Sequence, residues 1–363
     1  MITKFPAMRW VLLGLLLFPS ALYSQDFDKT VDFSGQFFFS FERIFEDEAV
    51  NNEFTIQRGY ITFRKNLSEM AEIRFTQDVS IDQEGDGEGN IELRLKYALL
   101  KLNFEDKGFF TSPNLELGVV HRPWIDFEQK INDYRSQESM FLDQNGIVSS
   151  ADYGVTFSSL LGGELDEEYQ EEVQSSYPGR YGSLSFGVYN GGGYSALERN
   201  NNKLLEGRFT LRPLPDHLPG FQTSLIGSVG EGNIPESPDF RLGGTALSYE
   251  SKHWASVIQG FISTGDASGE FVTQSLQPID LKGWSMFLEI KPFDNLPIAL
   301  TNRFDEIINR DLNNWIERQA VGGVAYIFPN HSKIIFNVRR NWYQENGETD
   351  NISRLEIITE IRF

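Results

Sequence analysis

Hydrophobic and polar residues alternate strictly in the last eleven residues of the chain, 353–363. The residues of one parity are mostly apolar: Leu355, Ile357, Thr359, Ile361 and Phe363. Charged residues occupy the other parity: Arg354, Glu356, Glu360 and Arg362. Because successive side chains of a strand point to opposite faces, the stretch predicts a strand with one apolar and one charged face. Soluble sheets and membrane barrels both contain such strands. The number of similar segments along the chain is therefore needed to distinguish the two folds.

The same alternation returns along the whole chain. It begins in residues 31–42, 54–65 and 71–81 and in a fourth segment from residue 91, where Ile91, Leu93, Leu95 and Tyr97 oppose Glu92, Arg94 and Lys96. The pattern blurs at Leu99 and Leu100, which predicts a β-bulge there. Twelve further strands are predicted at residues 114–122, 152–160, 181–190, 203–212, 220–229, 241–250, 254–263, 281–290, 297–305, 316–328, 332–343 and 352–363. The prediction is therefore all-β, with sixteen strands.

The lengths of the connections favour a membrane barrel over a soluble sandwich. Connections after even-numbered strands are mostly short turns, such as residues 66–69 and 251–252. Those on the other side include the longer residues 121–151, 190–202 and 263–280. An even number of antiparallel strands, short periplasmic turns and longer external loops are typical of transmembrane β-barrels of the bacterial outer membrane. We therefore assign residues 25–363 to an outer-membrane β-barrel.

The first residues of the chain resemble an export signal. Lys4 and Arg9 precede an apolar run over residues 10–18, and small residues follow before Gln25. This pattern predicts a signal peptide over residues 1–24. The apolar run is too short for a transmembrane anchor, which needs about 20 residues.

Composition excludes several classes of site and partner. The chain has no cysteine, so disulfides and cysteine-ligated metals are excluded. Without residues 1–24 it keeps 30 basic and 52 acidic residues, a net charge of −22, which argues against binding nucleic acid. Phe, Tyr and Trp number 30, 13 and 6, although the mean hydropathy is negative. Many aromatic residues without long apolar runs suit a barrel in contact with outer-membrane lipid, where rings form girdles at the interfaces.

A barrel of sixteen strands is too wide for its own side chains to fill and encloses an aqueous channel. The strand phase places many charged residues on the inner face, with a slight excess of basic ones. The basic residues among them include Arg58, Arg64, Arg74, Arg94 and Lys96. Rings of Arg and Lys favour anions, whereas pairing with acidic residues on adjacent strands would only brace the wall. Both roles stay open for each residue.

One connection on the short-turn side departs from the pattern. Residues 162–179 are long and acidic, with six Asp and Glu residues between Glu164 and Glu172. We expect a solvated, disordered periplasmic insertion. A divalent-cation site is the alternative, although the spacing matches no defined calcium loop.

Two short motifs resemble the phosphate-selective porin O and P family. Residues 54–78 (FTIQRGYITFRKNLSEMAEIRFTQD) resemble its opening hairpin, and LGVVHRPW, with Gly118, Pro123 and Trp124, resembles the strand end before its third external loop. The two motifs lie in the first half of the chain, whereas the predicted number and order of strands resemble the family over the whole chain. It implies a sixteen-stranded porin that assembles as a homotrimer.

In that family the third external loop folds inward and narrows the channel. The corresponding stretch is residues 124–150, and the residues that match its basic lining are Arg122, Lys130 and Arg135. Here the stretch is acidic overall, because it also contains Asp126, Glu128, Asp133, Glu138 and Asp143. Phosphate therefore stays open as the solute.

Three functions remain after the sequence is considered. The first is a porin for passive diffusion of small hydrophilic solutes or anions, with no catalytic residue, cofactor or metal, and with Arg58, Arg64, Arg74, Arg94, Lys96, Arg122, Lys130 and Arg135 as pore-lining candidates. The second is a hydrolytic barrel that would use a histidine, and the third is an adhesive or structural barrel. The aromatic carboxyl terminus, Phe363, resembles the signal that the barrel-assembly machinery recognises.

Overall fold

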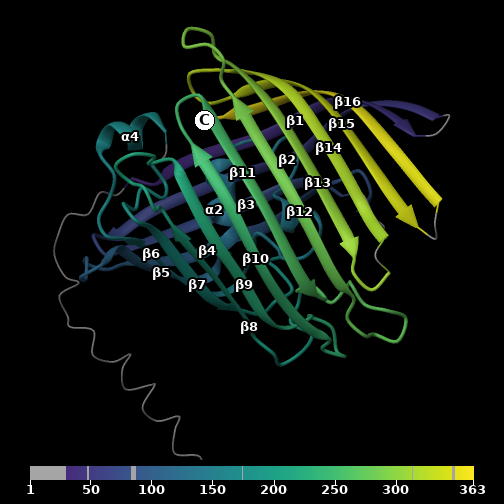
Figure 1. Ribbon diagram of the computed structural model, residues 1–363, viewed down its shortest axis with the longest axis horizontal. Coiled ribbons are helices and arrows are strands. Elements are labelled where there is room, and N and C mark those ends of the chain that lie inside the picture. The colour runs from purple at the N-terminus through teal and green to yellow at the C-terminus, as the bar shows by residue number, and fades with distance from the viewer. Residues whose placement is uncertain (1–29, 47–48, 83–86, 174, 313, 346–347) are drawn as a thin grey trace, which may run out of the picture.

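The residues described by this computed structural model form a closed antiparallel β-barrel of sixteen strands (Figure 1). The described ranges are residues 30–46, 49–82, 87–173, 175–312, 314–345 and 348–363. The predicted signal peptide, residues 1–24, lies outside them. Within the described ranges, none of the helices has the length and hydropathy that a membrane span requires.

Every strand pairs with its neighbour in the sequence, and the first pairs with the last. In register, Gln36 lies opposite Arg362 and Phe45 opposite Ser353, which closes the cylinder. The strands are β1 Asp32–Glu46, β2 Ala49–Ser68, β3 Ala71–Ile81, β4 Ile91–Asn103, β5 Phe110–His121, β6 Ala151–Leu161, β7 Gly182–Tyr189, β8 Leu204–Leu211, β9 Phe221–Glu231, β10 Asp239–Glu250, β11 Trp254–Thr264, β12 Asp280–Ile290, β13 Ile298–Asn309, β14 Asn314–Ile327, β15 Lys333–Glu345 and β16 Glu348–Arg362. The predicted count of sixteen is confirmed.

The alternation in β16 divides an outer from an inner face. Leu355, Ile357 and Ile361 are more than 40% exposed on the outside of the barrel, whereas Glu356 and Glu360 are at most 3% exposed inside it. An apolar outer face and a polar inner face are the reverse of a soluble protein, and they suit a cylinder surrounded by hydrocarbon.

Several strands run further than their side-chain pattern predicts. The first strand continues to Glu46 and the second begins at Ala49, so that residues such as Asn51 and Asn52 are paired in the hairpin. The pattern ends earlier because these side chains are polar on both faces. The backbone ladder nevertheless continues, since each strand finds a neighbour to pair with.

The predicted bulge in β4 is displaced by a few residues. Thr76 pairs with Tyr97 and Gln77 with Leu95, so the unpaired residue is Lys96 rather than Leu99 or Leu100. A bulge reverses the phase of the strand beyond it. The assignment of Tyr97 to the outer face is therefore wrong, because this side chain is 5% exposed inside the barrel.

The two ends of the barrel differ in their connections. We call the end where β1 begins and β16 ends the terminal end, and the opposite one the loop end. Short turns at the terminal end join β2 to β3 and β10 to β11, while long connections at the loop end join β5 to β6 and β11 to β12. This asymmetry agrees with the prediction.

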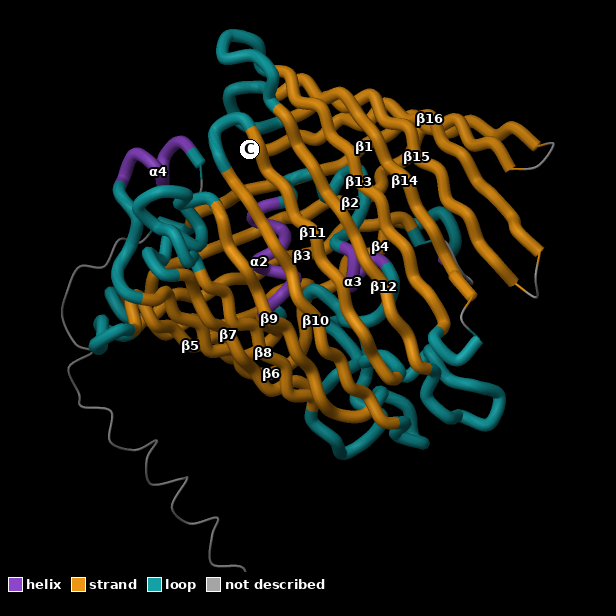
Figure 2. Tube along the Cα trace, viewed as in Figure 1, coloured by secondary structure: helices purple, strands orange, loops and turns teal. Residues whose placement is uncertain are grey.

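Residues 162–173 and 175–179 form a folded element at the terminal end, so the prediction of a disordered insertion is wrong. They contain α4, Glu167–Glu172, which lies at one rim of the barrel (Figure 2). Asp166 caps this helix by accepting a hydrogen bond from the Tyr169 backbone amide at 2.8 Å. Tyr177 is the anchor: its hydroxyl donates to Asp126 Oδ2 at 2.6 Å, and its ring lies 5.1 Å from that of Phe127. Arg208 and Arg212 also lie over the rings of Tyr177 and Tyr169, and a pattern of charges gave no indication of these aromatic contacts.

The start of β1 and the end of the chain meet at the seam between β1 and β16. Gly35 and Phe363 exchange two backbone hydrogen bonds of 2.9 and 3.1 Å. A Cβ atom at Gly35 would lie 2.3 Å from the Phe363 ring, so the glycine leaves the space that this ring fills. The ring also lies 5.8 Å from that of Phe33 and stacks on Phe37. The terminal aromatic residue thus covers the closing seam.

Candidate functional site: a channel beside an inserted segment

Residues 122–150, which join β5 to β6, enter the barrel instead of projecting from it; we call them the inserted segment. They contain α2, Pro123–Ile131, and α3, Phe141–Gln144, and both lie within the ring of strands (Figures 1 and 2). Pro123 at the first turn of α2, Asp126 near its N-terminus and Lys130 in its last turn suit the helix dipole. An inward course of residues 124–150 is implied only by the family resemblance; in this structure the helices of the segment lie within the ring of strands.

Polar contacts fix the inserted segment to the far wall, β11 to β16. Each of them joins a side chain of the segment to a strand: Trp124 Nε1 to Gln259 (3.0 Å), Tyr134 Oη to Glu289 (2.6 Å), Ser136 Oγ to Glu360 (2.9 Å), Gln137 Nε2 to Thr301 (2.9 Å) and Asn337 (2.8 Å), and Arg339 Nη1 to Glu138 (2.7 Å). The segment therefore spans the lumen from β5 to the opposite side.

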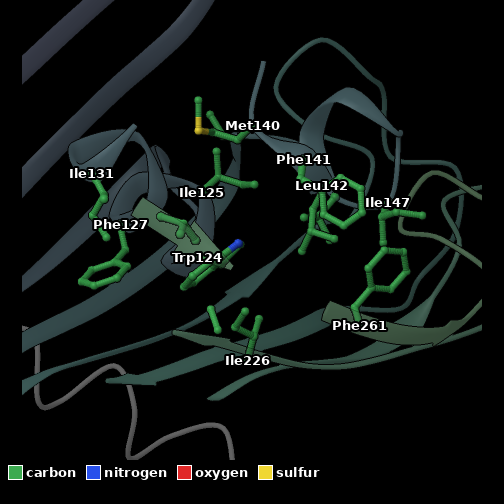
Figure 3. Packing of buried hydrophobic residues seen from close by; sticks show 14 of the residues in the cluster. Trp124, Ile125, Phe127, Ile131, Met140, Phe141, Leu142, Ile147, Ile226 and Phe261 are labelled. Carbon is green, nitrogen blue, oxygen red and sulfur yellow. The ribbon is translucent and has the colours of Figure 1, made fainter. Parts of the chain in front are cut away.

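Apolar packing fills the space between the inserted segment and β9 to β11. Trp124, Phe127, Phe141 and Ile147 are at most 1% exposed and belong to one cluster with Phe261 of β11 (Figure 3). The rings of Phe141 and Phe261 lie 5.7 Å apart. This side of the lumen is a hydrophobic core, so any channel must run on the other side.

A glycine in the wall makes room for one anchor of the inserted segment. A Cβ atom at Gly323 of β14 would lie 2.5 Å from Gln137 Nε2 and 3.0 Å from Thr301 Oγ1. We expect Gly323→Leu to displace Gln137, break its two hydrogen bonds and push the segment into the open side of the lumen. Single-channel conductance should fall. Gly322→Leu is the matched control, because a Cβ there meets nothing closer than 3.9 Å; equal conductance of the two variants would contradict this account.

Three cavities follow one another on the open side of the lumen. The first, of about 700 Å³, opens at the loop end near Asp82. The second, the central cavity, has about 300 Å³ and shares Tyr60 and Arg135 with the first. The third, of about 360 Å³, reaches Asn103 at the terminal end and shares five residues with the central cavity: Arg64, Arg74, His121, Asp126 and Lys130. Together they form a path along β1 to β5, off the axis of the barrel.

Charge changes along this path. The first cavity has four basic and five acidic lining residues, and the third has five basic and three acidic ones. The central cavity has a single acidic residue, Asp126, and six basic ones: Arg64, Arg74, Lys96, Lys130, Arg135 and Arg362. The narrow middle of the path is therefore its most positive part.

Aromatic rings hold the cations of the central cavity. Arg135 Nη2 donates to the Tyr60 hydroxyl at 2.6 Å, and its guanidinium lies 4.6 Å from the centre of that ring. Lys96 Nζ lies 5.0 Å from the Tyr60 ring and 5.3 Å from the Tyr194 ring, and it donates to Ser150 Oγ at 3.0 Å. Within the described residues neither cation has a carboxylate partner at ion-pair distance. Cation–π contacts stabilise the charges and leave their field unneutralised.

His121 links the central and terminal cavities. Its Nδ1 lies 2.7 Å from Glu116 and its Nε2 lies 2.8 Å from Arg74 Nη1. Because a guanidinium only donates, this Nε2 must accept, which places the proton on Nδ1. The His121 ring stacks on the Tyr97 ring with 4.2 Å between their centres, and the Arg74 guanidinium lies 4.5 Å from the centre of the same Tyr97 ring. The neighbouring Asp126 is buried, which raises its pKa, but His121, Lys130 and the Tyr177 hydroxyl outweigh burial and hold the pKa well below its usual range.

The structure separates the eight predicted pore-lining residues into two groups. Arg64, Arg74, Lys96, Lys130 and Arg135 line the central cavity. The other three lie in ion pairs: Arg58 with Asp78 at 3.0 Å, Arg94 with Glu92 at 3.5 Å, and Arg122 with Asp152 at 3.4 Å and Glu206. Arg122 is fully buried in this cluster, and Arg58 lines only the wider first cavity. The pore-lining role of all eight stays a prediction.

Sequence reasoning missed the aromatic residues of the site. Tyr194 comes from the connection between β7 and β8 and donates its hydroxyl to Asp78 at 2.8 Å. It follows three glycines, two of which, Gly191 and Gly193, have positive φ angles of 114° and 85°. This glycine run was the available signal, since it permits a tight return of the chain into the barrel.

A buried carboxyl group couples the inserted segment to pH. Burial raises the pKa of Glu128, on α2, to about 7, and its Oε1 accepts from Gln259 Nε2 at 2.5 Å. In the unfolded chain the group ionises near 4.3. The folded state therefore binds more protons between pH 4.3 and 7, and its stability falls as the pH rises through that window.

We expect Glu128→Gln to flatten this dependence, because glutamine keeps the acceptor and cannot ionise. The thermal unfolding midpoint of the parent protein should fall between pH 5 and pH 8 more steeply than that of the variant. Glu172→Gln, on the exposed α4, is the control. Parallel pH profiles of the parent protein and Glu128→Gln would contradict the assignment.

Comparison with known proteins reveals a likeness in fold. No family model matches the chain, and no curated protein sequence matches it. Among solved structures, the outer membrane channel DcaP of Acinetobacter baumannii has a TM-score of 0.60 at 11% identity, covering 94% of this chain and 100% of that one. An anion-selective porin from Comamonas acidovorans gives 0.59 at 9% identity, covering 92% and 99%. The trimer form of OmpT, an outer membrane protein of Vibrio cholerae, gives 0.56 at 11%, also covering 92% and 99%.

These matches agree on the sixteen-stranded barrel and extend over nearly all of each chain. At such low identity they concern the fold. The narrower resemblance to the phosphate-selective porin O and P family stays a prediction.

Proposed function

We propose that this protein is a porin of the bacterial outer membrane through which small hydrophilic solutes diffuse passively. The observation that carries the proposal is the row of three cavities, joined by shared lining residues, between the inserted segment and β1 to β5. The apolar outer face of the strands suits contact with lipid. The likeness in fold to an outer membrane channel and to a porin supports the same function.

The proposed channel prefers anions, of which phosphate is one. Every solute that crosses must pass the central cavity, where six basic residues face one acidic residue. Arg and Lys groups attract anions through their field and their hydrogen-bond donors. The negative net charge of the chain does not oppose this, because acidic residues lie mainly outside the central cavity.

Further parts of the proposal concern assembly. The chain would form a homotrimer, as the Vibrio cholerae protein in its trimer form suggests by fold. Phe363 would be recognised by the barrel-assembly machinery, since it lies at the terminal strand and covers the seam.

Transport is a better account of His121 than hydrolysis. A general base needs a free ring nitrogen directed at a nucleophile, whereas both nitrogens of this ring are engaged, by Glu116 and by Arg74. We therefore propose a channel without catalytic activity.

Conductance measurements in planar bilayers test the proposed function. The purified protein should form stable channels in potassium chloride, and the reversal potential in a salt gradient should have the sign of chloride preference. Absence of conductance would overturn the porin assignment. Conductance with potassium preference would keep the porin and remove the anion preference.

A further inference from the structure

Three basic side chains interrupt the apolar outer face of the barrel towards its loop end: Lys282 on β12, Arg318 on β14 and Arg340 on β15. Strand phase shows that they point outward. Trp284, two residues after Lys282, is 41% exposed, and Val338, two residues before Arg340, is 55% exposed. We call these three residues the outer basic patch.

Strand register places the residues of the outer basic patch along and on both sides of one row of paired residues. Trp284 lies opposite Glu306, Glu306 opposite Arg318, and Arg318 opposite Trp342. This row crosses four adjacent strands, β12 to β15, which are about 4.8 Å apart from one strand to the next. Lys282 and Arg340 flank the row, because Lys282 pairs with Ile308 and Arg340 with Ala320.

The patch keeps a net positive charge. Glu306 forms an ion pair with Arg318 at 2.6 Å and accepts from Trp284 Nε1 at 2.9 Å. One carboxylate thus faces three cations. Further toward the loops, Asp280 and Arg310 pair with each other at 3.5 Å and leave this balance unchanged.

Tryptophan rings orient both guanidinium groups. Arg318 lies 4.6 Å from the Trp315 ring and Arg340 lies 5.1 Å from the Trp342 ring. Arg318 Nε donates to Glu306 at 2.6 Å and Arg340 Nη2 donates to Asn351 at 3.2 Å, so the remaining N–H groups of the two guanidinium groups are the ones available to phosphate oxygens. Tryptophan is also typical of the interface between hydrocarbon and headgroups.

An apolar groove of about 610 Å³ adjoins the patch on the outer wall. Lys282 and Trp284 line it together with Gly243, Gly260 and Ile262. The glycines are not required by internal packing: a Cβ at Gly243 would meet nothing within 4 Å, and one at Gly260 would meet only a backbone oxygen at 3.6 Å. The groove is therefore open to a ligand from outside, of acyl-chain character.

We propose that the outer basic patch and this groove bind a membrane lipid that carries phosphate in its headgroup. One phosphate contacts Arg318 and Arg340, a second contacts Lys282 at the edge of the groove, and an acyl chain lies in the groove. Basic residues that face hydrocarbon cost up to about 2–4 kcal/mol each at the bilayer midplane, and less near the interface. A phosphate partner offsets this cost. The inference rests on the proposed function only in requiring that the barrel spans a membrane.

Binding of diphosphoryl lipid A to the purified protein in neutral detergent tests the proposal, with native mass spectrometry as the readout. We expect the Lys282→Gln/Arg340→Gln double variant, which retains the Glu306–Arg318 pair, to bind about tenfold more weakly than the parent protein. Arg340→Gln alone should bind about threefold more weakly and disturbs the wall less. Lys65→Gln, an outward lysine near the terminal end of β2, is the matched control and should bind as the parent protein does.

Monophosphoryl lipid A, which has the same acyl chains and one phosphate fewer, separates charge from chain binding. Its affinity for the parent protein should be lower than that of the diphosphoryl lipid, and the double variant should weaken its binding by a smaller factor. Equal affinity of the parent protein and all variants for the diphosphoryl lipid would overturn the proposal. The proposal would also be overturned if the double variant changed the number of subunits but not the lipid affinity. Lipid binding by a protein that conducts no ions would refute the proposed porin and leave this inference intact.

Discussion

Replacing Lys96 by glutamate should abolish or reverse the anion preference that we propose for this protein. The residue is the bulge of β4, lies in the central cavity and has no carboxylate at ion-pair distance among the described residues. Two unit charges 4 Å apart interact by about 1 kcal/mol even in water, and more in a narrow site. Changing a positive into a negative charge should therefore lower the chloride-to-potassium permeability ratio by about fivefold or more. The reversal potential in a potassium chloride gradient measures this ratio.

Two further variants make the result interpretable. Lys96→Met removes the charge and keeps the length of the side chain, so it should give an intermediate permeability ratio. It replaces Lys96→Glu as the test in case glutamate at this buried position hinders folding. Lys203→Glu has the same change of net charge on an exposed lysine at the loop end, paired with Glu198 at 3.2 Å. An equal shift for Lys96→Glu and Lys203→Glu would show that total charge, and not the central cavity, sets selectivity.

Deleting Phe363 should strongly reduce the amount of assembled barrel. The deletion removes both backbone hydrogen bonds with Gly35 and the ring that fills the space above this glycine. A glycine covered by an aromatic side chain stabilises strand pairing. The fraction of protein that is folded in the outer membrane, judged by its shifted electrophoretic mobility before heating, measures the effect. Channels that do assemble should keep their conductance, since the ring faces outward.

Side-chain variants separate the ring from the backbone. Phe363→Ala keeps the two backbone hydrogen bonds and should still assemble poorly, whereas Phe363→Tyr keeps an aromatic ring and should assemble nearly as well as the parent protein. Normal folded levels of Phe363→Ala would show that the ring has no role in assembly.

Strand number, strand phase and the uneven loops could be predicted because each follows from local sequence. The period of two in β16 assigns Leu355 and Ile357 to the outside and Glu356 to the inside without knowledge of any partner. Closure follows because a sheet that crosses a membrane cannot leave unpaired edges. Prediction failed where one residue breaks the period. Lys96 and Tyr97 both face inward because of a bulge, and the register that creates it belongs to the pair β3 and β4.

The candidate site could be predicted only in part. The phase of β2 to β4 predicted that Arg58, Arg74 and Arg94 face inward. It did not show that Asp78 lies beside Arg58 and Arg94, because an ion pair depends on which residues are opposite in register. The ion pairs of Arg122 could not be predicted for the same reason, since its partners Asp152 and Glu206 come from other strands.

Local alternation thus sufficed to predict a sixteen-stranded barrel, its apolar exterior and charged interior, and a terminal aromatic residue at the seam. The position of the cavities depends instead on tertiary contacts. The inserted segment packs against the far wall through contacts such as that between Ser136 and Glu360, which are 224 positions apart. Such contacts depend on how the chain returns across the lumen, and no local periodicity encodes that. They leave the cavities on the side of β1 to β5, where among the described residues Lys96 and Arg135 have no carboxylate at ion-pair distance.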